Sequence, residues 1–125
     1  MRFLLDTHAL IWYSDSTGKL SNRAEELIDN PENTVFISSA SLWEIAIKIR
    51  LKRIGISFNK LLGEIEKADL TVLHAENIYL KELIDLPLIH KDPFDRLLIA
   101  TAKSEDMTLI TADEDIHKYD VKWVW

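Results

Sequence analysis

The sequence predicts a three-layer α/β/α fold with a central parallel sheet of about four to five strands. Short apolar runs alternate with amphipathic segments along the whole chain. Such alternation is typical of right-handed β-α-β units, which build a parallel sheet with helices on both faces. The 125 residues include only three Gly and three Pro, and we see no linker and no internal repeat. We therefore expect a single domain over residues 1–125.

Two strands and three helices are expected in the first half of the chain. Ser21 is suited to cap a helix, since Ser side chains accept hydrogen bonds from the amides of the first turn, and Pro31 follows its end. Ser41 is the expected cap of the next helix, in which apolar residues recur at helical spacing. The expected elements are a strand over 3–5, helices over 8–13 and 21–28, a β-branched strand over 34–37 and a helix over 42–49.

The second half of the chain is expected to add three strands and four helices. Asp92 and Pro93 together mark a helix start, with a capping acid followed by Pro at the first helical position. Trp123 and Trp125 are expected to anchor the terminus or cover an edge strand. The expected elements are helices over 58–68 and 75–83 around a weak strand over 71–73, a helix over 93–104, a strand over 108–110, a short helix over 113–118 and a strand over 121–125.

The composition narrows the functional classes. Lys and Arg number 15 against 21 Asp and Glu, which is a net charge of −6 and argues against nucleic-acid binding by a broad electrostatic field alone. It suits an enzyme with acids in one cleft, or a partner with a basic segment. The absence of Cys excludes disulfides and thiolate metal sites. No apolar run approaches a membrane span or a signal peptide, so we expect a complete, soluble, cytoplasmic chain.

Four acids fall where a strand gives way to a helix or where a helix begins. Asp6 follows the first strand, Glu44 starts the helix after the second, Asp95 starts a later helix and Asp113 follows the strand over 108–110. Each acid alone has a structural explanation. Asp6 and Asp113 suit helix caps, Glu44 completes a capping box with Ser41, and Asp95 complements a helix dipole.

Taken together, these acids point to a metal site. The carboxyl ends of parallel strands meet at one edge of the sheet, where ligands bind in such folds. Like charges gathered there repel one another and raise their pKa values unless a cation joins them. Oxygen ligands without Cys favour Mg²⁺ or Mn²⁺ over Zn²⁺. Such a site suits hydrolysis of phosphodiester bonds.

Four segments of the chain resemble PIN-domain nucleases of the VapC toxin type, in the family's order and across nearly the whole chain. The run Asp-Pro-Phe-Asp-Arg is the most specific part of the resemblance. The four segments are Leu4-Leu5-Asp6-Thr7-His8, Ser38-x-x-Ser41-x-Trp43-Glu44-Ile45, the run from His90 to Ala100, and Leu109-Ile110-Thr111-Ala112-Asp113.

The resemblance implies a PIN-like fold of Rossmann-like topology and assigns roles to the acids. Asp6, Glu44, Asp95 and Asp113 would form the metal-binding, catalytic quartet, with Asp6 and Asp95 as direct ligands. The other two would complete the shell through water or orient the nucleophile. Asp92 is interpreted as a cap rather than a ligand. Asp115 is the alternative to Asp113. We prefer Asp113 because it follows Thr111 at the family's usual position.

The resemblance also implies an activity and partners. It indicates a Mg²⁺-dependent endoribonuclease, with Mn²⁺ as a substitute, that acts as the toxin of a type II toxin–antitoxin pair. The implied partners are the RNA substrate, a cognate VapB-like antitoxin and a second copy of the chain in a homodimer. A housekeeping RNA-processing nuclease and an inactive, protein-binding PIN-like domain are alternatives.

Two other classes fit poorly. A signalling receiver domain needs a second acid beside Asp6 and an acid after the strand over 71–73, where the chain has Thr7 and His74. A nucleotide-binding Rossmann domain needs a Gly-rich phosphate loop, which is absent.

Cationic side chains near the acids in sequence are explained mainly by structural roles. The basic run of Lys48, Arg50, Lys52 and Arg53 reads as the cationic end of a helix, with RNA phosphate contacts as a further hypothesis. Arg96 is expected to pair with a carboxylate.

Overall fold

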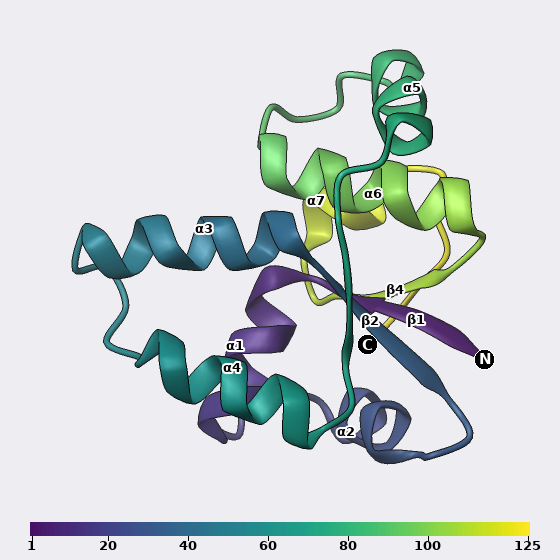
Figure 1. Ribbon diagram of the computed structural model, residues 1–125. Coiled ribbons are helices and arrows are strands. Elements are labelled where there is room, and N and C mark those ends of the chain that lie inside the picture. Colours follow the sequence, from purple (N-terminus) through teal and green to yellow (C-terminus); the bar gives the residue numbers. More distant parts are fainter.

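The centre of the protein is a five-stranded sheet, seen in a computed structural model that describes residues 1–125 (Figure 1). Every pairing is parallel, and the strand order is β3-β2-β1-β4-β5. The chain runs outward from β1 through β2 to β3, and then crosses to β4 and β5 on the other side of β1. The strand order therefore reverses at the central strand β1. The strands are β1 Arg2–Leu5, β2 Thr34–Ser38, β3 Thr71–Leu73, β4 Thr108–Ile110 and β5 Trp123–Val124.

Helices cover both faces of this sheet, which confirms the predicted three-layer α/β/α fold. In Figure 1, α1, α2 and α4 lie on one side of the strands, and α5, α6 and α7 lie on the other. The helices are α1 Thr7–Asp15, α2 Asn22–Asp29, α3 Ser39–Arg50, α4 Phe58–Lys67, α5 Asn77–Asp85, α6 Pro93–Glu105 and α7 Glu114–His117. None of them is both long and apolar enough to cross a membrane.

Alternation along the strands divides the core into two clusters. Leu5 and Ile110 belong to the cluster that includes residues of α1, α2, α3 and α4. Leu4 and Leu109 belong to the cluster that includes residues of α6 and α7. Successive side chains of a strand point to opposite faces, so fully apolar strands supply both clusters at once.

The start of α3 differs from the prediction, and the expected cap at Ser41 is wrong. Ser38, the last residue of β2, is the N-cap, and its Oγ accepts a hydrogen bond from Ala40 N at 3.0 Å. Ser41 lies inside the helix and accepts a hydrogen bond from Thr7 Oγ1 at 3.0 Å. Because the helix begins three residues earlier, Glu44 is not in its first turn and forms no capping box.

The last strand is also shorter than expected. β5 has two residues instead of the five predicted, since only Trp123 and Val124 pair with β4. Trp125 still anchors the terminus, because its ring packs edge-on against Trp12 with 5.7 Å between centroids.

The position of the α3 cap leads to a stability prediction. Ser38→Ala should lower the free energy of unfolding by about 1 kcal/mol, because an amide of the first turn loses its acceptor. The neighbouring Ser39→Ala, which removes no side-chain hydrogen bond, should change it by less than about 0.5 kcal/mol. Urea denaturation followed by circular dichroism measures both. Equal effects of the two substitutions would contradict the assignment of the cap.

Candidate active site

Asp6 sits in the connection between β1 and α1, at the point where the strand order reverses. Its Oδ1 caps α1 by accepting a hydrogen bond from Ala9 N at 2.7 Å. Its Oδ2 accepts a hydrogen bond from Thr111 Oγ1 at 2.5 Å, and its own backbone N–H donates to Ile110 O. Burial raises the pKa of Asp6 against the lowering effect of these hydrogen bonds, and the charge of Asp113 raises it further.

Thr111 links Asp6 to Asp113. Thr111 is fully buried, and its Oγ1 donates to Asp6 while accepting from Asp113 N at 3.0 Å. Asp113 in turn caps α7 by accepting from Asp115 N. Asp115 is exposed and forms an ion pair with Lys118 at 3.1 Å on the surface. Of the two, it is Asp113 whose charge acts on the other acids of this edge.

Asp95 lies in the first turn of α6. Asp92 is the N-cap of this helix, as expected, and accepts a hydrogen bond from Asp95 N at 2.9 Å. Burial raises the pKa of Asp95 to about 7, aided by the charges of Asp92, Asp113 and Glu44. A hydrogen bond with His90, at 3.2 Å from Nε2 to Oδ2, acts in the opposite direction. The folded chain therefore holds the Asp95 proton more tightly than an unfolded chain does.

Glu44 comes from the second turn of α3 and is only 8% exposed. Its Oε2 forms an ion pair with Lys48 Nζ at 3.0 Å. Its Oε1 is buried and has no hydrogen-bond partner in the protein. A buried oxygen without a partner costs roughly 1–3 kcal/mol, so this atom is a candidate ligand for a group that the chain itself does not supply.

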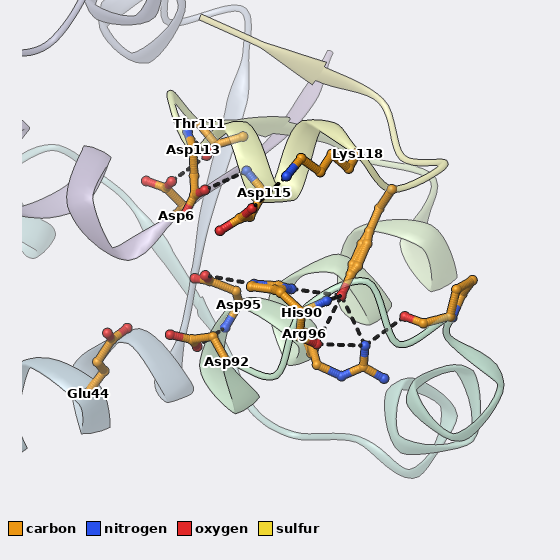
Figure 2. A network of polar contacts seen from close by, with 12 residues as sticks. Asp6, Glu44, His90, Asp92, Asp95, Arg96, Thr111, Asp113, Asp115 and Lys118 are labelled. Carbon is orange, nitrogen blue, oxygen red and sulfur yellow. Dashed lines mark hydrogen bonds and ion pairs between the residues drawn. The ribbon is translucent and has the colours of Figure 1, made fainter.

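These acids face one another across the carboxyl edge of the sheet. In Figure 2 the Asp95 carboxylate lies between Asp6 and Asp113 on one side and Asp92 on the other, and Glu44 points towards them from α3. The carboxylates do not form a ready-made cage, since no three His, Cys, Asp or Glu side chains are grouped as a metal site. Mg²⁺ needs only one or two carboxylates, because it keeps several waters and takes phosphate oxygens.

The residues present fit such a hard divalent cation. All the candidate ligands are carboxylates, one of their buried oxygens has no partner, and the pKa values of Asp6 and Asp95 are raised. A cation held among them would offset each of these costs.

Arg96 does not pair with a carboxylate, so that prediction is wrong. Its guanidinium is buried and donates to the carbonyl oxygens of Leu86 at 3.2 Å and Pro87 at 2.8 Å, and to the Tyr119 hydroxyl at 3.0 Å. Each of these acceptors is neutral. Arg96 therefore fastens the loop between α5 and α6 against the segment after α7, and its burial keeps it from contacting a substrate.

Sequence reasoning missed several residues of this neighbourhood. Thr111 and His90 lie inside the segments that carry the resemblance, but nothing in their spacing showed that they contact Asp6 and Asp95. Two aromatic residues were also missed. Trp43 is 65% exposed, and its ring packs edge-on against that of Phe94 with 5.2 Å between centroids. In the sequence, Trp43 directly precedes Glu44, and Phe94 directly precedes Asp95.

Comparison with known proteins adds an independent finding. The family model of the PIN domain matches residues 3–122. A search of curated protein sequences finds no significant match.

Several solved structures share the fold over nearly their whole length. VapBC2 from Rickettsia felis bound to a promoter DNA fragment is 18% identical, with a TM-score of 0.75, covering 99% of this chain and 98% of that chain. FitAcB from Neisseria gonorrhoeae is 20% identical, with a TM-score of 0.68, covering 98% and 96%. VapBC-5 from Mycobacterium tuberculosis, of the VapBC family of toxin–antitoxin systems, is 18% identical, with a TM-score of 0.65, covering 98% and 97%.

Identities this low establish similarity of fold, whereas the family match rests on almost the entire sequence. It agrees with the three-layer α/β/α fold around a parallel sheet. The chain belongs to the PIN domain family.

Proposed function

We propose that the protein is a metal-dependent endoribonuclease that uses Mg²⁺, or Mn²⁺ as a substitute, and acts as the toxin of a type II toxin–antitoxin pair. The observation that carries the proposal is the gathering of poorly neutralised acids where the strand order reverses. Asp6, Glu44, Asp95 and Asp113 reach this place from four separate parts of the chain. PIN domains are generally nucleases, which supports the same conclusion.

The four acids would share the work as follows. Asp6 and Asp95 bind the ion directly, and the free lone pairs of Asp6 have fixed directions because Thr111 and Ala9 hold its carboxylate. Glu44 presents its unpartnered Oε1, and Asp113 orients the attacking water. When bound, the ion supplies positive charge that favours a hydroxide-like water and offsets charge on the phosphate.

The proposed substrate is RNA, and exposed cations follow Glu44 along α3 and just beyond its end. Lys48 forms an ion pair with Glu44, but Arg50, at the end of α3, and Lys52, just beyond it, are exposed. They would locally offset the repulsion that a chain of net charge −6 exerts on RNA.

The proposed partners are a VapB-like antitoxin and a second copy of the chain, in the cytoplasm. The VapBC and VapBC-5 structures that share this fold come from toxin–antitoxin systems. The protein also exposes large apolar side chains that a partner could cover. Ile84 at the end of α5 is 81% exposed, and Leu88 in the following loop is 82% exposed.

The first prediction from the proposed function concerns the metal ion and the carboxylates that bind it. Purified protein should cleave single-stranded RNA with Mg²⁺ or Mn²⁺ and should stop when EDTA is added. Asp6→Asn and Asp95→Asn should each lower kcat by about 100-fold or more, because a direct ligand supplies several kcal/mol of transition-state stabilisation. Gel analysis of a labelled RNA over time measures the rates.

Two neighbouring acids serve as matched controls. Asp92→Asn keeps a capping oxygen for α6, and Asp115→Asn removes only a surface ion pair. Both variants should retain most of the activity, whereas Asp113→Asn should lose it. Cleavage that survives EDTA and Asp6→Asn would refute the proposed function and would favour a protein-binding role for the domain.

The second prediction concerns pH and follows from the raised pKa of Asp95. Because the folded chain holds this proton more tightly than the unfolded chain, the contribution of Asp95 to stability is greatest at low pH. It should fall as the pH rises from about 4 to about 7, by at most about 4 kcal/mol. Asp95→Asn should remove most of this loss, so the metal-free variant should be the more stable protein at pH 8. Thermal melting across pH values measures the effect.

Mg²⁺ provides the control for this experiment. It should raise the melting temperature of the wild-type chain at pH 8 and have little effect on Asp95→Asn. Substitution of the exposed Asp85 by Asn should leave the pH dependence unchanged. Wild-type and Asp95→Asn chains whose stabilities change in the same way between pH 4 and pH 7 would contradict the raised pKa.

The third prediction concerns the antitoxin. If a small protein with a DNA-binding start and a basic or aromatic tail is encoded next to this chain, the two should co-elute and RNA cleavage should stop at a 1:1 ratio. A VapB-like protein from an unrelated pair, tested at the same concentration, is the matched control. Equal inhibition by both, or by neither, would contradict a cognate pair.

A further inference from the structure

The hydroxyl group of Tyr119 is a buried hydrogen-bonding centre behind Asp95. Its oxygen lies 3.0 Å from Arg96 Nη1, 3.1 Å from the backbone nitrogen of His90 and 2.7 Å from His90 Nδ1. The Arg96 nitrogen and the His90 amide nitrogen have hydrogens but no free lone pair, so both can only donate. A tyrosine hydroxyl has two lone pairs and one hydrogen. These two donors therefore use both of its lone pairs.

This arrangement determines which nitrogen of His90 carries the proton. The Tyr119 hydroxyl can only donate its hydrogen, and its nearest acceptor is His90 Nδ1 at 2.7 Å; the His90 carbonyl lies farther away, at 3.4 Å. A hydrogen on Nδ1 would be a third donor aimed at one oxygen. The neutral imidazole therefore carries its hydrogen on Nε2, since one ring nitrogen donates when the other accepts.

The opposite side of the ring faces the candidate site. His90 Nε2 lies 3.2 Å from Asp95 Oδ2, so the Nε2–H donates to that oxygen. Asp95 Oδ1 takes part in no hydrogen bond of the protein, which leaves it available to a ligand. The His90 ring therefore lies between the Tyr119 hydroxyl, near Nδ1, and the Asp95 carboxylate, near Nε2. Figure 2 shows the ring beside the Asp95 carboxylate.

Arg96 makes this arrangement rigid. Its two terminal nitrogens hold the carbonyls of Leu86 and Pro87, and one of them also donates to Tyr119. Leu86 and Tyr119 both belong to the apolar cluster on this face of the sheet. The loop that presents His90 is thus tied to the core at both of its ends, and Asp95 lies in the first turn of the helix that follows it.

We propose that His90 is a positioning residue of the candidate site: Tyr119 and Arg96 fix its Nε2–H tautomer, and this N–H holds the Asp95 carboxylate with Oδ1 free for a divalent cation. The role of the cation rests on the proposed function, whereas the tautomer does not. A side chain that donates a hydrogen bond to a metal ligand orients that ligand, and its loss typically costs 10- to 100-fold in metal affinity.

The first experiment reads the tautomer directly in the metal-free protein. Nitrogen-15 NMR of the imidazole ring should show His90 with a protonated Nε2 and an unprotonated Nδ1, with the signals assigned by loss in His90→Gln. Tyr119→Phe removes the hydroxyl that donates to Nδ1, so the Nδ1–H tautomer should become populated beside the Nε2–H tautomer that Asp95 still favours. A wild-type His90 that carries its hydrogen on Nδ1 would overturn the proposal.

The second experiment measures Mn²⁺ binding by titration calorimetry without RNA. His90→Ala should weaken binding by about 10- to 100-fold. His90→Gln should recover part of the affinity, because its amide nitrogen can donate from about the place of Nε2, whereas His90→Leu should not. His74→Ala, at an exposed histidine on another loop, is the matched control and should bind like the wild type.

The outcomes separate this proposal from the proposed function. If the wild type binds Mn²⁺ and a folded His90→Ala variant binds it equally well, the positioning role is refuted and the proposed function stands. If the wild type binds no Mn²⁺, the proposed function fails, together with the role of His90 towards the cation. The NMR result then still decides whether Tyr119 and Arg96 fix the ring.

Discussion

Two hydrogen bonds join Asp6 to the last residue of β4 and to the residue that follows it, and the geometry of the candidate site depends on them. The Asp6 amide donates to Ile110 O, which extends the pairing of β1 and β4 by one step, and Thr111 Oγ1 donates to the Asp6 carboxylate. β1 is the central strand of the sheet, with two strands on each side. At the place where the strand order reverses, the connection after β1 is therefore hydrogen-bonded to the connection after β4. Chains that reverse their strand order leave a crevice at this position.

Most of the acids at this edge have a structural role that would also serve their proposed role as metal ligands. Asp6, Asp92 and Asp113 each cap a helix, as the sequence predicted. Capping holds these carboxylates in place by hydrogen bonds to backbone amides before any ion arrives. Asp95 and Glu44 cap no helix, and of these two only Glu44 has a buried oxygen without a partner. Its burial is the feature that helix chemistry alone does not explain.

The sequence predicted the layers, the parallel sheet and the order of the elements, because hydrophobic periodicity and helix caps are local signals. It failed where two residues were chemically equivalent or where contacts were long-range. Ser38 and Ser41 are both good caps, and only the end of β2 decides between them. Arg96 donates to neutral carbonyl oxygens and not to a carboxylate, because the loop after α5 folds back over its guanidinium. The contact between Thr111 and Asp6 joins residues 105 positions apart, beyond the reach of local patterns. Within the candidate site, the sequence identified the acids but not the side chains that hold them.

The short edge strands limit how this protein can associate. A sheet usually recruits another chain through the unpaired backbone groups of its outermost strand. Here the two outermost strands, β3 and β5, have only three and two residues. So short a ladder offers few backbone hydrogen bonds to an incoming strand, whether from a nascent copy or from a misfolded neighbour. Association is thereby left to helix surfaces and side chains, where the identity of the residues, and not the backbone, decides which molecule is accepted.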